Sequence, residues 1–144
     1  MSDTRKRVAV VGLGYIGLPT ALLLARSHTV VGVDIDTEHV QELNSGEIPF
    51  DEPGLSELYE EVQSQFTAQT TVPDTADCYV IATPTPLDDV TRVPDLSHIK
   101  AAADSVGAAT DPGDLVILES TVPPGTSTRL VRPRLETASD HTGA

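Results

Sequence analysis

The chain of 144 residues is long enough for one domain with a sizeable core, and 39% of its residues are hydrophobic. Its formal net charge of −13 at pH 7 repels nucleic acid and anionic lipid, so we expect no nucleic-acid partner and no membrane partner. The single cysteine, Cys78, excludes an internal disulfide and is typical of a cytoplasmic protein.

Short apolar runs alternate with helical patterns along the chain. In chain order, the expected strands lie within residues 7–14, 29–36, 66–72, 76–86 and 113–121, and the expected helices lie within 15–27, 38–43, 55–62, 95–106 and 122–136. The first and last strands are expected to be buried, and Asp95 is the expected N-cap of the fourth helix. The alternation predicts the α/β class, with a doubly wound parallel sheet that has helices on both faces.

A glycine-rich turn follows the first strand and opens the first helix. Glycines occupy positions 12, 14 and 17, the G-x-G-x-x-G spacing that can hold the diphosphate of a dinucleotide. Gly12 allows the tight turn, Gly14 lets the backbone approach the diphosphate, and Gly17 lets the helix pack closely on the strand. The backbone amides of Tyr15 and Ile16 would then point at phosphate oxygens. The alternative is a glycine-rich turn without a ligand.

Asp34 ends the second strand, 22 residues after Gly12. A carboxylate at this place accepts hydrogen bonds from ribose hydroxyls and repels a 2′-phosphate, and no Lys or Arg lies within the next 50 residues to attract that phosphate. We therefore predict NAD rather than NADP as the cofactor. The alternative, that the aspartate only starts the next helix, fits Asp36 better.

Hydroxyl side chains follow the fourth and fifth strands. Thr83 and Thr85 alternate with prolines, a combination suited to the wall of a cofactor groove, although a plain turn is the competing interpretation. Further hydroxyls lie at Ser120, Thr121 and residues 126–128, and an ordinary N-cap explains one of these but not the set. Cys78 is expected to be a buried core thiol, and the four histidines show no metal-ligand spacing, so no metal site is expected.

These motifs together resemble the amino-terminal domain of the UDP-glucose/GDP-mannose dehydrogenase family, the nucleotide-sugar dehydrogenases. The matching stretches are "VVGLGYIGLPTA", "VVGVDID", "GEIPFDEPGL", "ADCYVIATPTP", "PDLSHI" and "GDLVILESTVPPGT", in the family's order. The resemblance implies a Rossmann-type NAD-binding domain over residues 1–136, followed by a polar tail over 137–144. Two of the stretches, "GYIGLPTA" and "LVILESTVPPGT", look most like the UDP-N-acetyl-D-mannosamine dehydrogenase branch, and the UDP-glucose 6-dehydrogenase branch is the nearest alternative.

The resemblance also implies an activity and a set of site residues. Members of the family oxidise the C6 alcohol of a UDP-sugar to a carboxylate with two NAD, through an aldehyde that a cysteine thiolate captures. Thr121 matches an auxiliary threonine beside the reacting carbon, where it helps hold a water. The residues implied to line the NAD site are Gly12, Gly14, Tyr15, Ile16, Gly17, Asp34, Thr83, Thr85 and Ser127.

The chain departs from the family pattern because it stops at Ala144, before the parts that carry the nucleophilic cysteine, the oxyanion-stabilising lysine and the sugar-binding domain. We therefore expect this chain alone to bind NAD and to turn over nothing, and the full-length enzyme to be a homodimer. His39 stands where members often carry a lysine. A different class of function, a stand-alone NAD-binding module without catalysis, also stays open.

The acidity of the chain has two open explanations. Fourteen acids and no Lys or Arg lie between Arg26 and Arg92, and only two of the nine basic residues are lysine. This pattern is typical of adaptation to high salt, where screening removes most of the self-repulsion. The alternative is an acidic surface without a function. A melting temperature that rises steeply with KCl distinguishes the first explanation from the second.

Overall fold

The computed structural model describes residues 4–139 and contains a five-stranded parallel sheet with the strand order β3-β2-β1-β4-β5. All four pairings are parallel and in continuous register. The strands are β1 (Arg7–Val11), β2 (Thr29–Val33), β3 (Phe66–Gln69), β4 (Cys78–Ile81) and β5 (Leu115–Leu118). The order places β1 at the centre, so the loop that follows it lies in the middle of the carboxyl edge of the sheet.

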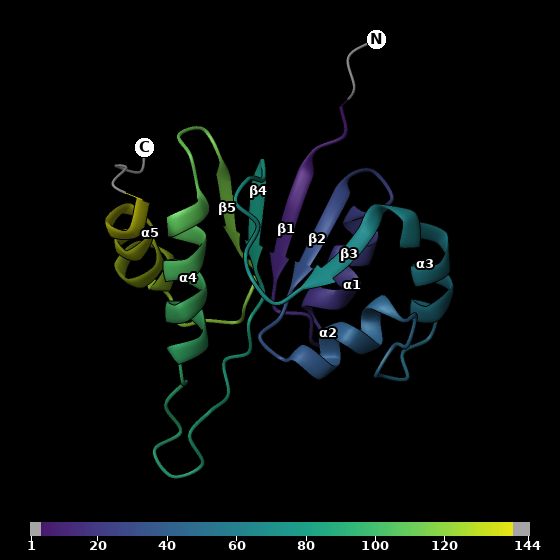
Figure 1. Ribbon diagram of the computed structural model, residues 1–144. Helices are drawn as coiled ribbons and strands as arrows, with labels where there is room; N and C mark the ends of the chain where they lie inside the picture. The colour runs from purple at the N-terminus through teal and green to yellow at the C-terminus, as the bar shows by residue number, and fades with distance from the viewer. Residues whose placement is uncertain (1–3, 140–144) are drawn as a thin grey trace.

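Helices pack on both faces of the sheet (Figure 1). They are α1 (Gly17–Leu24), α2 (Thr37–Asn44), α3 (Leu55–Val62) with the short helix η1 (Gln63–Gln65), α4 (Ser97–Ala109), the π-helical turn η2 (Ser127–Val131) and α5 (Arg132–Ser139). One core cluster joins Val8 and Val10 to residues of α1, α2 and α3, and the other joins Ala9 and Val11 to residues of α4 and η2. Successive residues of β1 therefore face opposite helix layers, and the predicted doubly wound α/β fold is confirmed.

The helix boundaries differ from the sequence predictions by small amounts. Helix α1 begins at Gly17 and ends at Leu24, inside the expected range, and Pro19 lies in its first turn. Asp36 is the N-cap of α2, and its carboxylate accepts from the backbone amides of Glu38 and His39. The expected N-cap of α4 is wrong by one residue, because Leu96 occupies that position. Asp95 instead accepts a hydrogen bond from the amide of Ser97, at 2.9 Å.

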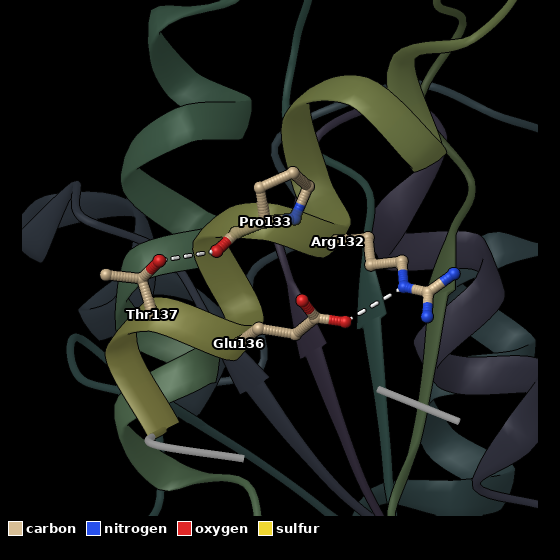
Figure 2. Close-up of polar contacts among 4 residues, drawn as sticks. All are labelled: Arg132, Pro133, Glu136 and Thr137. Atoms are coloured by element: carbon tan, nitrogen blue, oxygen red, sulfur yellow. Dashed lines mark hydrogen bonds and ion pairs between the residues drawn. The ribbon is translucent and has the colours of Figure 1, made fainter. Parts of the chain in front are cut away.

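The carboxyl-terminal helical run passes from η2 directly into α5. Pro133, which has no amide hydrogen, lies at the second residue of α5, next to the π-helical turn. Figure 2 shows two contacts within the first turns of α5: Arg132 Nε lies 2.9 Å from Glu136 Oε1, and the Thr137 hydroxyl donates to the carbonyl of Pro133 at 2.8 Å. The expected boundary between residues 136 and 137 therefore falls within a helix, and residues 140–144 of the expected tail lie outside the described residues.

Strand β5 is not buried as expected. It pairs with β4 alone, and it is the edge of the sheet among residues 4–139. Its residues alternate in exposure, and Leu115 and Ile117 are 56% and 43% exposed. Val116 and Leu118, in contrast, pack against the core cluster that contains α4, so Leu115 and Ile117 face away from that cluster. Within the same range, no helix is long and apolar enough to cross a membrane.

Candidate functional site

A cleft of about 750 Å³ runs along the carboxyl ends of the strands. The segments that follow all five strands contribute to its wall, and one face of α4 completes it. Open α/β sheets bind their ligands at this edge. The lining residues are 11–16 at the end of β1 and after it, 33–35 at the end of β2 and after it, 70–72 after β3, 82–85 after β4, Ser120 and Thr121 after β5, and residues 98, 101, 102 and 105 of α4.

The glycine-rich turn is tightly packed at two of its three glycines. Gly12 has φ +100°, and a Cβ there would lie 2.7 Å from the carbonyl oxygen of Ala82. A Cβ at Gly17 would lie 1.7 Å from the carbonyl oxygen of Gly12. A Cβ at Gly14, in contrast, would meet nothing within 4 Å, although Gly14 lines the cleft. Gly12 and Gly17 are therefore required by the fold, whereas Gly14 leaves open space that a bound diphosphate can occupy.

Asp34 ties the end of β2 to the glycine-rich turn. One carboxylate oxygen accepts from the amide of Leu13 at 3.0 Å, and the other accepts from the amide of Asp36 at 3.0 Å. A carboxylate has about four acceptor positions, so Asp34 keeps capacity for ribose hydroxyls. Asp36 performs the helix-capping role. The capping role expected of Asp36 is therefore confirmed, whereas the ribose contact of Asp34 stays a prediction.

Hydroxyl groups join the loops that follow β4 and β5. The Ser120 hydroxyl donates to the carbonyl of Thr83 at 2.7 Å, and the Thr85 hydroxyl donates to the carbonyl of Thr121 at 2.7 Å. All four of these residues were singled out in the sequence, but their mutual contacts span 36 and 37 residues and were not predicted. The two loops therefore form one continuous wall of the cleft.

The side-chain hydroxyl of Thr83 is buried and has no hydrogen-bond partner. It is the one such side-chain group among the described residues. A buried hydroxyl without a partner is costly, and most such groups in proteins are paired. Thr83 also lines the cleft. Its hydroxyl is therefore available to a ligand that binds there.

The structure places the remaining predicted site residues in different surroundings. Thr121 lines the cleft, as do Tyr15 and Ile16, whereas Gly17 lies behind it in the packing of helix on strand. Ser127 begins η2, outside the residues that line the cleft. The neighbouring hydroxyls bond locally, Thr126 to the carbonyl of Pro123 and Thr128 to the carbonyl of Gly125.

Two parts of the cleft wall were not predicted from the sequence. Residues 70–72 lie at the carboxyl end of β3, a strand end that carried no motif. On α4, His98, Ala102 and Ser105 line the cleft at i, i+4 and i+7, the spacing of one helix face. That periodicity is visible in the sequence, but it was used there only for the apolar side of the helix.

The charge of the cleft wall suits an anion held by backbone groups. Asp34 is the one carboxylate and His98 the one basic side chain among the lining residues. Phosphates would therefore depend on the amides at the start of α1 and on the positive end of that helix. A 2′-phosphate next to Asp34 would meet a negative charge with no Lys or Arg in the described wall to offset it.

Cys78 lies at the amino end of β4, away from the cleft wall. It is partly rather than fully buried, and it packs against the cluster of α1, α2 and α3. Burial, and then the nearby carboxylate of Asp77, raise the pKa of the Cys78 thiol. The thiol therefore stays protonated near neutral pH, which agrees with a structural role. Among residues 4–139, no group of three or more His, Cys, Asp or Glu side chains could hold a metal ion.

Comparisons with known proteins agree on one family. Residues 6–144 match the model described as "UDP-glucose/GDP-mannose dehydrogenase family, NAD binding domain". The NDP-N-acetyl-D-galactosaminuronic acid dehydrogenase of Ralstonia nicotianae is 47% identical over 127 residues, which cover 87% of this chain and 30% of that protein. The UDP-N-acetyl-D-mannosamine dehydrogenase of Campylobacter jejuni is 42% identical over 136 residues, which cover 93% of this chain and 33% of that protein.

Solved structures give the same result. The UDP-D-ManNAc dehydrogenase of Pyrococcus horikoshii superposes with a TM-score of 0.89 at 38% identity, covering 96% of this chain and 34% of that one. The chain thus spans about a third of the length of the relatives it matches.

Proposed function

The chain belongs to the UDP-glucose/GDP-mannose dehydrogenase family, within its NAD-binding domain, and we propose that it holds NAD while the whole protein oxidises UDP-N-acetyl-D-mannosamine to the uronate. Each turnover would use two NAD. The single observation that carries the cofactor part is the cleft at the carboxyl ends of the strands, with its glycine-rich turn at the centre. The choice of sugar is supported by the 42% identity to a relative named for that substrate.

The residues on the two sides of the cleft would hold different parts of NAD. The amides of Tyr15 and Ile16, with the open space at Gly14, fit the diphosphate. Asp34 fits the adenosine ribose, because its carboxylate has spare acceptor capacity at the end of β2. When bound, NAD supplies an acceptor for the hydride that leaves the sugar.

The loops after β4 and β5 would bind the nicotinamide half. Thr83 offers a buried hydroxyl without a partner, and Thr85 is held in place by its bond to the carbonyl of Thr121. Thr121 would orient a water near the reacting carbon. Ser127 remains a proposed cofactor contact, and it would require a ligand that extends beyond the cleft wall to the start of η2.

A calorimetric titration tests the cofactor proposal. NAD should bind, and NADP should bind at least ten-fold more weakly, because Asp34 would repel the 2′-phosphate. Equal affinity for the two would contradict the assignment of Asp34. Asp34→Asn removes the charge but keeps the shape of the side chain, so it should reduce the difference in affinity between NAD and NADP.

The activity proposal needs the whole protein that carries this domain. With UDP-N-acetyl-D-mannosamine, the whole protein should release two NADH per sugar, and UDP-glucose and a UDP-N-acetylgalactosamine substrate serve as comparisons. A preference for the galactosamine substrate would favour the second candidate, which rests on the 47% identity to the Ralstonia protein. The 144-residue chain alone should give no NADH, and turnover by it would contradict the proposal.

We place the NAD-binding unit in residues 1–136, so a chain without 137–144 should keep its affinity for NAD. The whole protein is proposed to be a homodimer, which light scattering can test. It is also proposed to act in the cytoplasm, where free NAD is available.

A further inference from the structure

We propose that Phe50 and His39 brace the glycine-rich turn from outside the cleft and thereby prepare its amides for the diphosphate. Neither residue is part of the cleft wall, so both would be positioning residues. Phe50 lies in the loop between α2 and α3, and His39 lies in α2. This inference rests on the proposed binding of NAD.

The first contact is made through Tyr15. Its side chain is 72% exposed, and it lines the cleft directly after Gly14. Its ring stacks on the ring of Phe50, with centroids 4.6 Å apart and planes at 29°. Phe50 in turn packs against the core cluster of α1, α2 and α3. An exposed ring at the cofactor cleft is therefore anchored to the core by a residue from a distant loop.

The second contact is made to Leu13, between two of the glycines. His39 Nε2 lies 2.7 Å from the carbonyl oxygen of Leu13. A carbonyl oxygen can only accept, so Nε2 carries the hydrogen in this contact. The amide of Leu13 donates to Asp34 at the same time. Both polar backbone groups of Leu13 are thus held by side chains.

The two bracing residues also lie near each other. The ring centroids of His39 and Phe50 are 6.3 Å apart, with the planes tilted by 42°. His39, Phe50 and Tyr15 therefore form a continuous row from α2 to the turn. The row contacts the turn on both sides of Gly14, at Leu13 and at Tyr15.

A glycine-rich turn gains from such a brace because glycine has the largest conformational freedom of any residue. Amides that already point toward an anion lose less entropy when the anion binds, and the affinity rises accordingly. Gly14 makes no packing contact through a side chain and faces open space. Its carbonyl accepts from the amide of Leu18 at 3.1 Å, and the side-chain contacts of Leu13 and Tyr15 restrict it further. Loss of the brace should weaken ligands that contain a diphosphate and spare ligands that do not.

The test compares Phe50→Ala with Ile48→Ala in the full chain. Ile48 lies in the same loop and packs against the same core cluster, which makes it a matched control. For Phe50→Ala, we expect the Kd for NAD to rise about three- to ten-fold, the range for loss of an aromatic pair. The Kd for adenosine, which has no phosphate, should change by less than about two-fold. Phe50→Tyr keeps the stack and should restore the affinity for NAD.

A second pair of variants tests His39. His39→Gln retains an N–H donor that can reach a carbonyl, whereas His39→Ala has none. We expect His39→Ala to weaken NAD binding and His39→Gln to recover most of it.

Three results would overturn the proposal that Phe50 braces the turn. The Kd for NAD could stay unchanged in Phe50→Ala, or the affinities for NAD and adenosine could fall equally. The third is an Ile48→Ala variant whose affinity for NAD falls as far as that of Phe50→Ala. If the unmodified chain does not bind NAD, the proposed function fails instead.

Discussion

The two sides of the cleft are built on opposite principles. The glycine side consists of the loops after β1 and β2. There the backbone packs so closely at Gly12 and Gly17 that no side chain fits at either position. On the hydroxyl side, which consists of the loops after β4 and β5, the backbone is held by side chains that are present, at Ser120 and Thr85. On the first side, steric exclusion adds to the hydrogen bonds that Asp34 and His39 make to Leu13, whereas hydrogen bonds between the two loops shape the second side.

This difference predicts how each side responds to substitution. An atom placed where a backbone oxygen already lies cannot be accommodated without moving the turn. A lost hydroxyl removes one bond of modest net strength and leaves the packing nearly intact. The glycine side should therefore tolerate little change, whereas the hydroxyl side should respond gradually.

The largest effect is expected for Gly17→Ala. Its Cβ would lie 1.7 Å from the carbonyl oxygen of Gly12, so α1 or the turn must move. We expect a loss of about 3 kcal/mol or more in the free energy of unfolding, measured by urea denaturation. A loss below about 1 kcal/mol would show that the turn can relax and would remove the contrast between the two sides.

Gly14→Ala sharpens the comparison within the glycine side. No atom lies within 4 Å of the added Cβ, so stability should change by less than about 1 kcal/mol. The methyl group would occupy space proposed for the diphosphate, and the Kd for NAD should rise at least about ten-fold. An unchanged affinity for NAD in a calorimetric titration would show that the diphosphate does not lie next to Gly14.

On the hydroxyl side, Ser120→Ala removes the 2.7 Å bond to the carbonyl of Thr83. We expect a stability loss of about 1 kcal/mol by urea denaturation, the ordinary value for one hydrogen bond. Thr128→Ala is the matched control, because its hydroxyl bonds locally in the exposed part of η2. If Thr128→Ala lowers the free energy of unfolding by as much, the hydrogen bond between Ser120 and Thr83 stabilises the protein no more than a local hydrogen bond does.

Thr83→Val should act in opposite directions on stability and binding. The buried hydroxyl has no partner in the free protein, so its removal should leave stability unchanged or raise it by up to about 1 kcal/mol. NAD should bind about three- to ten-fold more weakly if that hydroxyl bonds to the cofactor. A stability loss without a change in affinity would assign Thr83 to the fold alone.

The smallest effect on the cleft is expected from Cys78, at the other end of β4. Its pKa is raised by burial and by Asp77, so the thiolate fraction at a given pH is lower than for a free thiol. Alkylation of the native chain at pH 8.5 should therefore be slower than alkylation of the unfolded chain. The modified protein should keep its affinity for NAD, and a loss would indicate that β4 transmits strain to the hydroxyl side.

Much of the fold could be predicted because its signals are local. The alternating runs identified all five strands, and the G-x-G-x-x-G spacing placed the turn between β1 and α1. The capping role of Asp36 also followed from its place after β2. The burial of β5 was predicted wrongly, because an apolar run has the same appearance at the centre of a sheet and at its edge.

By itself, the sequence determined the α/β class, the family and the tight glycine turn, since periodicity and glycine sterics act over a few residues. Only the tertiary structure decided which distant residues meet. Ser120 reaches Thr83 across 37 residues, α4 closes the cleft with His98 and Ser105, and Phe50 supports Tyr15. Such contacts depend on how the strands are ordered in the sheet and how the loops pack, which no local pattern encodes.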